Sequence, residues 1–444
     1  MHDSITSPTD LTSSKPTFRE AFAVWLRIGL LSFGGPTGQI ALMHRMLVEE
    51  RKWIDDGRFL NALNFCMLLP GPEAMQLATY TGWWLHGLRG GLTAGLLFVL
   101  PGACVVLALS MIYASFGQVP AIETLFLGIK AAVLVIVVEA LLRISKRALK
   151  RPEHWLLAAL SFFALFFFGA PYPLLVAAAA AIGYVLARRQ STPASARAAA
   201  AMLHGVALSR TLATAALWLT IWIAPLLAIA AVFGRSHVLA QIGYFFSKLA
   251  VVTFGGAYAV LAYMGQDVAS QYGWITAGEM MDGLGLAETT PGPLILVTEF
   301  VGYLAGFRHG SAGPSLAMGL AGAVVTLWAT FAPCFLWVFT GAPYVEWLNS
   351  QPRLKGALAG VTAAVVGVIL NLALWFALHV FFGKVTLNMF GPLRLWTPDL
   401  TTLDWRIVVL AAVSAFLLLW RHWNVIAVLA VASTGALALR LAVT

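Results

Sequence analysis

The chain has 444 residues, of which 60% are hydrophobic and 11% are charged. Apolar runs such as 92–112, 211–232 and 354–382 each reach or exceed the roughly 20 residues that span a bilayer. This composition excludes a soluble domain and indicates a polytopic membrane protein. The net charge is +9, but the basic residues lie in short segments between apolar runs. That pattern orients membrane proteins and does not indicate a nucleic-acid-binding surface.

Other functional classes lack their usual signals. Cys66, Cys104 and Cys334 lie inside apolar segments without C-x-x-C spacing, which argues against a disulfide framework and a zinc site. The first 17 residues are polar, so we expect no cleaved signal peptide. No H-E-x-x-H, P-loop or G-x-S-x-G motif follows a suitable element. We therefore expect no enzyme, no metal and no cofactor.

The apolar pattern predicts an all-α membrane protein with about thirteen spans. They are expected at residues 20–44, 59–86, 90–116, 121–142, 154–168, 172–188, 212–234, 240–264, 279–304, 313–340, 354–382, 405–420 and 423–440. The pairs 154–168/172–188 and 405–420/423–440 are short. Each is compatible with a tight hairpin or with one long, tilted element.

The distribution of Lys and Arg favours a cytoplasmic N-terminus. With that orientation, 15 basic residues lie on the cytoplasmic side and 9 on the other. The segment 44–58 has four basic residues on the wrong side, although four acidic residues neutralise it. A re-entrant hairpin at 59–86 would move that segment to the cytoplasm and place the N-terminus outside. This topology is the alternative.

The sequence contains an internal repeat on either side of a basic linker at 189–211. A shift of 221 residues gives 12 identities over positions 33–72 without a gap. The matches include Phe33-Gly34-Gly35 with Phe254-Gly255-Gly256, Trp53 with Trp274, and Pro70-Gly71-Pro72 with Pro291-Gly292-Pro293. We expect repeats at 18–188 and 240–444, with a linking helix at 212–234. Seven spans separate equivalent points, so the repeats should be antiparallel, as in many secondary transporters.

The paired glycine and proline clusters predict broken helices at the middle of the membrane. Proline removes a backbone donor and paired glycines let the chain unwind. Unpaired N–H and C=O groups must then be buried in protein or line a cavity. Helix N-termini after Pro36, Pro72, Gly256 and Pro293 would favour an anion there. Close helix packing is the alternative reason for these residues.

Polar residues near the breaks complete a predicted anion site. Arg27 and Lys248 occupy equivalent positions and would balance about two negative charges, although each could instead reach the headgroup region. The other substrate-binding candidates are Ser32, Gly34, Gly35, Pro36, Gln39, Pro70, Gly71, Pro72, Gln76, Thr253, Gly255, Gly256, Thr290, Pro291, Gly292 and Pro293.

Glu288 is the candidate for proton coupling. It lies three residues before Pro291, and burial beside an anion would favour its protonated form. The alternative is an ion pair between Glu288 and a lysine, either Lys248 or Lys130. No equivalent carboxylate exists in the first half, where Met67 occupies the position.

These motifs resemble the chromate ion transporter family in its long, two-domain form. The resemblance rests on Phe33-Gly34-Gly35-Pro36, Leu69-Pro70-Gly71-Pro72, Phe254-Gly255-Gly256 and Leu286-Ala287-Glu288-Thr289-Thr290-Pro291-Gly292-Pro293, and it covers roughly residues 18 to 380. It implies a protein of the cell inner membrane that exports chromate and confers chromate resistance. The last 60 residues or so carry no motif of the family.

Three functions therefore compete. The first is a secondary transporter that expels chromate, with sulfate as a similar anion. The second is an oxyanion channel, and the third is an integral-membrane enzyme acting on a lipid or a phosphate ester. The expected partners are the anion and the lipid bilayer, without nucleic acid; a homodimer is left open.

Overall fold

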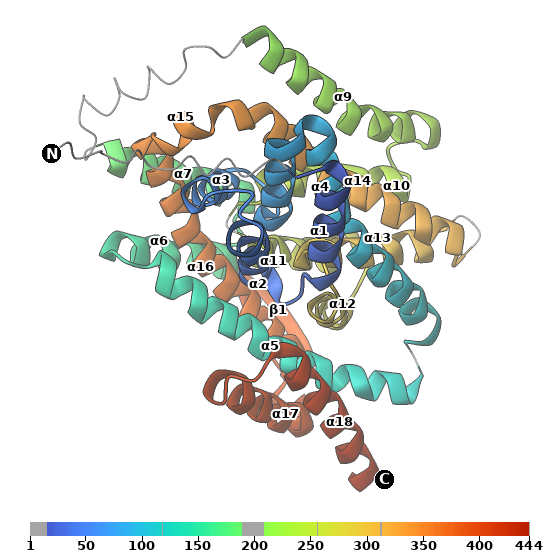
Figure 1. Ribbon diagram of the computed structural model, residues 1–444. Coiled ribbons are helices and arrows are strands. Elements are labelled where there is room, and N and C mark those ends of the chain that lie inside the picture. Colours follow the sequence, from blue (N-terminus) through green and yellow to red (C-terminus); the bar gives the residue numbers. More distant parts are fainter. Residues whose placement is uncertain (1–15, 118, 189–207, 255, 311–312, 444) are drawn as a thin grey trace, which may run out of the picture.

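The computed structural model describes residues 16–117, 119–188, 208–254, 256–310 and 313–443. The described chain is a bundle of helices with one β-hairpin (Figure 1). The expected linker at 189–211 lies outside the described residues up to position 207.

The first half begins with two broken helical hairpins and continues with long helices. Its helices are α1 (Phe18–Leu31), α2 (Gly35–His44), a π-helical turn (Arg45–Glu50), α3 (Asp56–Leu68), α4 (Glu73–Phe116), α5 (Pro120–Ala148), α6 (Pro152–Phe168) and α7 (Tyr172–Arg188). Helix α9 (Leu208–Phe233) leads into the second half.

The second half repeats this order of elements. Its helices are α10 (Val238–Val252), α11 (Ala257–Asp267), a π-helical turn (Val268–Tyr272), α12 (Ala277–Thr289), a 3-10 turn (Leu294–Leu296), α13 (Val297–Arg308) and α14 (Leu316–Gly341). A 3-10 turn (Ala342–Tyr344), α15 (Val345–Asn349) and α16 (Pro352–Phe381) follow. The chain ends with a 3-10 turn (Leu400–Thr402), α17 (Trp405–Ala415), a π-helical turn (Phe416–Trp420) and α18 (Val425–Val443).

The boundaries recur at the offset of the sequence repeat. Helix α12 begins 221 residues after helix α3, and both helices end just before a Pro-Gly-Pro segment. Their caps also match: Asp55 accepts a hydrogen bond from the Arg58 N–H at 2.9 Å, and Thr276 accepts one from the Glu279 N–H at 3.2 Å. Such caps satisfy N–H groups that lack partners in the first helical turn. Local sequence therefore sets the same start in both copies.

The two halves exchange their short C-terminal helices. Helices α6 and α7 of the first half pack on α16 of the second, while α17 and α18 pack on α5 of the first. Small residues allow this close contact: a Cβ added to Gly183 of α7 would lie 2.2 Å from the carbonyl oxygen of Gly356 in α16. Likewise, a Cβ on Gly128 of α5 would lie 2.2 Å from the carbonyl oxygen of Ala432 in α18. Close packing of backbones replaces the hydrophobic driving force that lipid removes.

Six helices of the described chain are long and apolar enough to cross a membrane. They are Glu73–Phe116, Pro120–Ala148, Leu208–Phe233, Leu316–Asn349, Pro352–Phe381 and Val425–Ala442. Four shorter apolar helices cover Pro152–Phe168, Tyr172–Ala187, Val238–Val252 and Trp405–Trp420. The structure therefore supports a multi-pass membrane protein, whereas the count of thirteen spans stays a prediction.

The predicted spans 59–86 and 90–116 meet at a sharp kink. Helix α4 joins two helices across His86 and Gly87, whose φ and ψ angles are not helical, and α3 ends at Leu68, before the Pro-Gly-Pro segment. Gly87 has φ +62°, which glycine adopts without steric strain.

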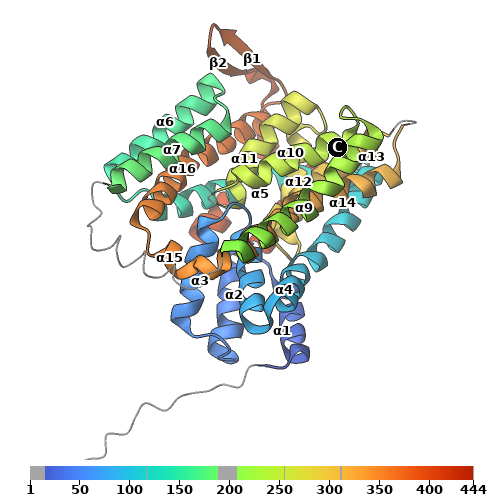
Figure 2. The same ribbon diagram turned by 90° about the horizontal axis from the view of Figure 1, so that it is seen from above.

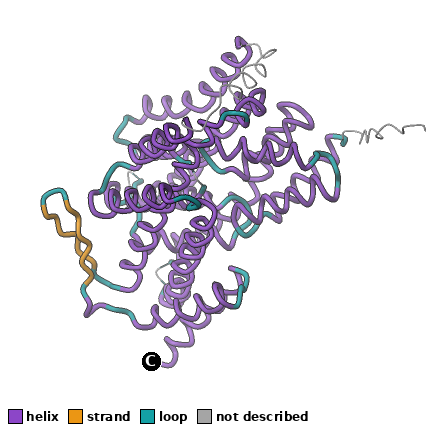
Figure 3. Tube along the Cα trace, turned by 90° about the vertical axis from the view of Figure 1, so that its left-hand side faces the viewer, coloured by secondary structure: helices purple, strands orange, loops and turns teal. Residues whose placement is uncertain are grey.

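The segment 383–404 lies between the predicted spans 354–382 and 405–420. It contains the antiparallel hairpin of β1 (Val385–Phe390) and β2 (Leu393–Pro398), which projects beyond the helices (Figures 2 and 3).

Candidate functional site

The four predicted breaks meet in pairs that join the two halves. The Gly71 N–H donates to the carbonyl oxygen of Thr253 at 3.0 Å, and the Gly292 N–H donates to that of Ser32 at 2.8 Å. Gly71 and Gly292 are equivalent in the repeat, as are Ser32 and Thr253. Each Pro-Gly-Pro segment thus binds the break after α1 or α10 of the other half. The prediction of broken helices at these motifs is confirmed.

Both Pro-Gly-Pro segments depend on a glycine with positive φ. Gly71 has φ +114° and Gly292 has φ +93°, which L side chains rarely adopt. Neighbouring side chains also leave no room for a larger residue at position 71, since a Cβ on Gly71 would lie 2.9 Å from Nε2 of Gln76 and 3.1 Å from Sγ of Cys334. These glycines bring the backbones of the two halves together. The two contacts, Gly71 with Thr253 and Gly292 with Ser32, are here called the crossing.

Two glutamines of the first half donate hydrogen bonds to backbone carbonyl groups at the crossing, and the second half has no equivalent glutamines. Gln39 is 1% exposed, and its Nε2 donates to the carbonyl oxygen of Gly292 at 2.7 Å. Gln76 is fully buried, and its Nε2 donates to the carbonyl oxygen of Pro70 at 2.7 Å. Their shifted equivalents are Val260 and Val297, which cannot make such bonds. The two amides satisfy carbonyl groups that the breaks leave without helical partners.

A cavity of about 170 Å³, here called the break cavity, lies beside the crossing. Its lining residues are Pro36, Thr37, Cys66, Met67, Leu69, Gly71, Glu73, Arg143, Ile144, Arg147, Gly256, Ala257, Tyr258, Leu358 and Thr362. Three of the four breaks contribute to this wall. The cavity volume exceeds that of a single water molecule several times over.

Three helices begin at the wall of the break cavity. Helices α2, α4 and α11 start at Gly35, Glu73 and Ala257, and the residue before each helix (Gly34, Pro72 or Gly256) provides no side-chain cap. The first turn of each helix has N–H groups without helical partners, and the helix dipole makes these ends partly positive. The arrangement favours an anion in the cavity.

Two arginines of α5 add positive charge to the same cavity. Arg143 forms an ion pair with Glu139 at 3.5 Å, between Nη1 and Oε1. Arg147 also lines the cavity and is exposed; among the described residues it has no ion pair. The sequence prediction placed both arginines in a cytoplasmic loop. Their spacing of four residues on one helix was the signal for a shared face.

Two carboxyl groups lie at or behind the cavity wall. Glu73 is the first residue of α4, and its Oε1 would be 3.8 Å from a Cβ on Gly256 at the start of α11. Glu288 is 6% exposed and accepts a hydrogen bond from the Tyr258 hydroxyl at 2.7 Å. Tyr258 itself lines the cavity. The tyrosine therefore connects the buried carboxyl group to the site.

The proposed ion pair of Glu288 with a lysine is not present in the structure. The Lys130 Nζ lies 3.4 Å from Oδ2 of Asp282, which also accepts a hydrogen bond from the Tyr113 hydroxyl at 2.8 Å. Lys248 instead lies over the ring of Tyr263, 5.5 Å from its centroid. Tyr258, and neither lysine, is the partner of Glu288. The cluster around Asp282 was missed because its three members come from three helices.

The structure distributes the remaining predicted site residues over several places. Ser32 and Thr253 are buried, and each hydroxyl donates to a carbonyl group four residues earlier in its own helix. Thr290 donates to the carbonyl oxygen of Ala287 at 3.1 Å. Arg27 is on the exposed face of α1 and does not line the break cavity. Gly34, Gly35, Pro70, Pro72, Pro291 and Pro293 belong to the breaks, and Gly255 lies outside the described residues.

Lys248 lines a second, larger cavity of about 760 Å³ next to the β-hairpin. It is therefore separated from Arg27, although the sequence placed the two at equivalent positions. The two cavities share no lining residue.

Comparison with known proteins identifies relatives over most of the chain. The family model described as "Chromate transporter" matches residues 19–184 and 240–438. The chromate transport protein of Pseudomonas aeruginosa is 33% identical over 95% of this chain and 92% of its own length. That of Cupriavidus metallidurans is 30% identical over 81% of this chain and 82% of its own length.

A more distant relative is an uncharacterized transporter of Methanocaldococcus jannaschii, 25% identical over 94% of this chain and 92% of its own length. No solved structure matches the chain. Each matched segment contains two breaks, and each of these meets a break of the other segment at the crossing. The chain belongs to the chromate transporter family.

Proposed function

We propose that this protein is a secondary transporter that exports chromate across the cell inner membrane and thereby confers chromate resistance. The observation that carries the proposal is the reciprocal bonding of the four breaks beside a cavity lined by Arg143 and Arg147. Two relatives that cover most of the chain are named chromate transport proteins. Sulfate has a similar tetrahedral shape and charge, so we expect it to compete.

The chemistry of the break cavity suits a dianion. Removing such an ion from water is very costly unless charges and hydrogen bonds replace its hydration. The starts of α2, α4 and α11 supply N–H groups, and Arg147 supplies a cation without a carboxylate partner among the described residues. These groups are held by rigid helices, so they need little rearrangement to bind the anion.

The proposed topology has antiparallel halves and a cytoplasmic N-terminus. In that orientation the end of α5, with Arg143 and Arg147, faces the cytoplasm, and the break cavity would load chromate from that side. The exchange of α6–α7 and α17–α18 between the halves supports the internal symmetry. Rocking one half against the other about the crossing would then expose the site to the opposite side. A homodimer stays a prediction.

Glu288 is proposed to couple transport to protons through Tyr258. Anion binding next to Tyr258 would favour protonation of the carboxyl group behind it, because a dianion and a nearby carboxylate repel each other. By linkage, protonation would favour anion binding to the same extent. The hydrogen bond of 2.7 Å between Tyr258 and Glu288 provides the contact.

Flux through the purified protein in liposomes tests the proposal. A carrier should exchange labelled chromate for unlabelled chromate on the opposite side of the membrane, and Arg147→Gln should slow this exchange at least tenfold. The matched control is Arg421→Gln, which removes an exposed arginine that lines neither cavity. Single-channel currents without exchange would instead establish a channel, and consumption of a lipid or phosphate ester an enzyme.

A further inference from the structure

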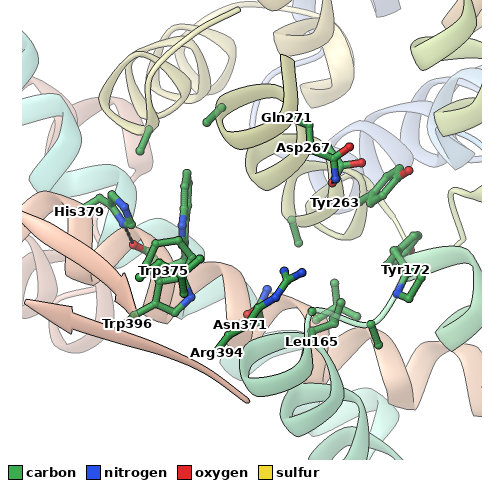
Figure 4. A pocket seen from close by; sticks show the side chains of 18 of the residues that line it. Leu165, Tyr172, Tyr263, Asp267, Gln271, Asn371, Trp375, His379, Arg394 and Trp396 are labelled. Atoms are coloured by element: carbon green, nitrogen blue, oxygen red, sulfur yellow. Dashed lines mark hydrogen bonds between the residues drawn. The ribbon is translucent and has the colours of Figure 1, made fainter. Parts of the chain in front are cut away.

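The cavity beside the β-hairpin, here called the hairpin cavity, has the dimensions of a ligand site. Its volume of about 760 Å³ lies within the range of small-molecule pockets. The walls are formed by the α6–α7 turn, α10 and α11, α16 and the hairpin. Figure 4 shows Arg394 extending from β2 beside Asn371, with Trp375, Trp396 and His379 on one side and Tyr263 and Asp267 on the other.

Cations outnumber carboxylates in this wall. Lys248, Arg308 and Arg394 line the hairpin cavity together with a single acidic residue, Asp267. Arg308 donates to Glu279 through both terminal guanidinium nitrogens, so its charge is already balanced. Lys248 and Arg394 have no ion pair within the described ranges. A concave wall with excess positive charge concentrates anions.

The hairpin presents its two faces differently. Leu387 pairs with Trp396 and Met389 with Arg394, so these four side chains share the face that lines the cavity. On the opposite face, Asn388 donates to the hydroxyl of Thr397 at 2.6 Å. Leu387 and Met389 are nonetheless 41% and 56% exposed. These two side chains therefore border open space, whereas Trp396 of the same face packs on α16, its ring centroid 5.5 Å from that of His379.

The hairpin cavity is connected to the crossing by α10. Lys248 precedes Thr253 by five residues, and the Thr253 carbonyl oxygen binds the Gly71 N–H. At 1.5 Å per residue, the two positions are about 8 Å apart along the helix. An anion held by Lys248 would thus be close to the crossing but separate from the break cavity.

We propose that the hairpin cavity is a second binding site for a tetrahedral oxyanion, bound by Arg394 and Lys248 and covered by the β-hairpin. This inference rests on the proposed function and adds a position that the anion occupies between bulk water and the crossing. The phosphate of a lipid headgroup shares this chemistry, so the test includes an arm for it.

Calorimetric titration of sulfate into the full-length protein in detergent tests the inference. The wild type should bind two sulfate ions. Arg394→Gln and Lys248→Gln should each weaken one of these sites at least tenfold, because each removes a charge-assisted bond. Asn388→Ala, on the outer face of the hairpin, and Arg421→Gln are the controls and should retain both sites. Unchanged unfolding temperatures will show that the variants are folded.

The outcomes separate this inference from the proposed function. One site that depends on Arg147 and is unaffected by Arg394→Gln would overturn the hairpin site and leave the transport function intact. No binding of either sulfate or chromate would contradict the proposed function itself. Displacement of sulfate from the Arg394-dependent site by short-chain phosphatidylglycerol, but not by phosphatidylcholine, would assign the site to a lipid headgroup. That result would overturn its role in the anion path.

Discussion

Gly71→Ala tests whether the crossing of the broken helices holds the transporter together. The new Cβ would meet Nε2 of Gln76 at 2.9 Å and Sγ of Cys334 at 3.1 Å, both closer than ordinary contact. Overpacking of this kind costs about 1–3 kcal/mol. The residue must also keep φ at +114°, and such backbone strain costs about 1–3 kcal/mol. We therefore expect destabilisation by about 2–6 kcal/mol in total.

A helical glycine nearby provides the matched control. Gly265 of α11 has no positive φ, and the nearest atom to a Cβ there would be Cγ of Met280 at 3.7 Å, an ordinary contact. Alanine is also favoured over glycine in a helix by about 1 kcal/mol. Gly265→Ala should accordingly be neutral or slightly stabilising.

Both variants can be compared by thermal unfolding in detergent and by chromate flux in liposomes with equal amounts of folded protein. For a chain of this size, about 2–6 kcal/mol corresponds to a fall of about 2–6 °C in the unfolding temperature. Gly71→Ala should show this fall and lose most of its flux, since the bond from the Gly71 N–H to Thr253 would be displaced. Equal unfolding temperatures and equal flux for Gly71→Ala and Gly265→Ala would show that the bond from Gly71 to Thr253 does not hold the halves together.

Three further predictions concern charge, backbone and coupling. Lys248→Gln should slow chromate efflux at least tenfold, whereas Arg27→Gln should change it less than threefold because Arg27 lines neither cavity; efflux from cells checks both, and the reverse order would contradict the placement. Gly35→Val and Gly256→Val should each abolish the Arg147-dependent sulfate site by calorimetry and retain the Arg394-dependent one, since φ is +70° and +95° at these positions in the breaks; two retained sites in either variant would remove that break from the anion site of the break cavity. Glu288→Gln should still bind chromate but lose the pH dependence of flux in vesicles, and an unchanged pH profile would exclude it as the coupling group.

The breaks were predictable because their cause is local. Clustered glycine and proline favour a break in a transmembrane helix, and the repeat puts the same Pro-Gly-Pro cluster at Gly71 and Gly292. Which carbonyl groups these residues bind was not predictable, because Ser32 and Thr253 belong to the opposite halves. That choice depends on how the halves pack, and sequence periodicity carries no such information.

The positions of charged side chains were harder to predict from the sequence than the positions of the helix breaks. Arg27 and Lys248 are equivalent in sequence, yet only Lys248 lines a cavity, since the surroundings of α1 and α10 differ. Arg143 and Arg147 were read as loop residues because their apolar span ended before them, whereas α5 continues to Ala148. The hairpin had a signal that was overlooked, namely alternating residues on both sides of Gly391-Pro392.

Anomalous diffraction from chromium can locate the bound oxyanion, which we propose lies in the break cavity. Crystals of the full-length protein soaked in chromate should show an anomalous peak within hydrogen-bonding distance of the Gly256–Ala257 backbone and the Arg147 guanidinium. The hairpin cavity should give a separate peak near Arg394. Anomalous peaks only outside the break cavity, in crystals whose redissolved and reconstituted protein transports chromate, would show that the oxyanion does not bind there.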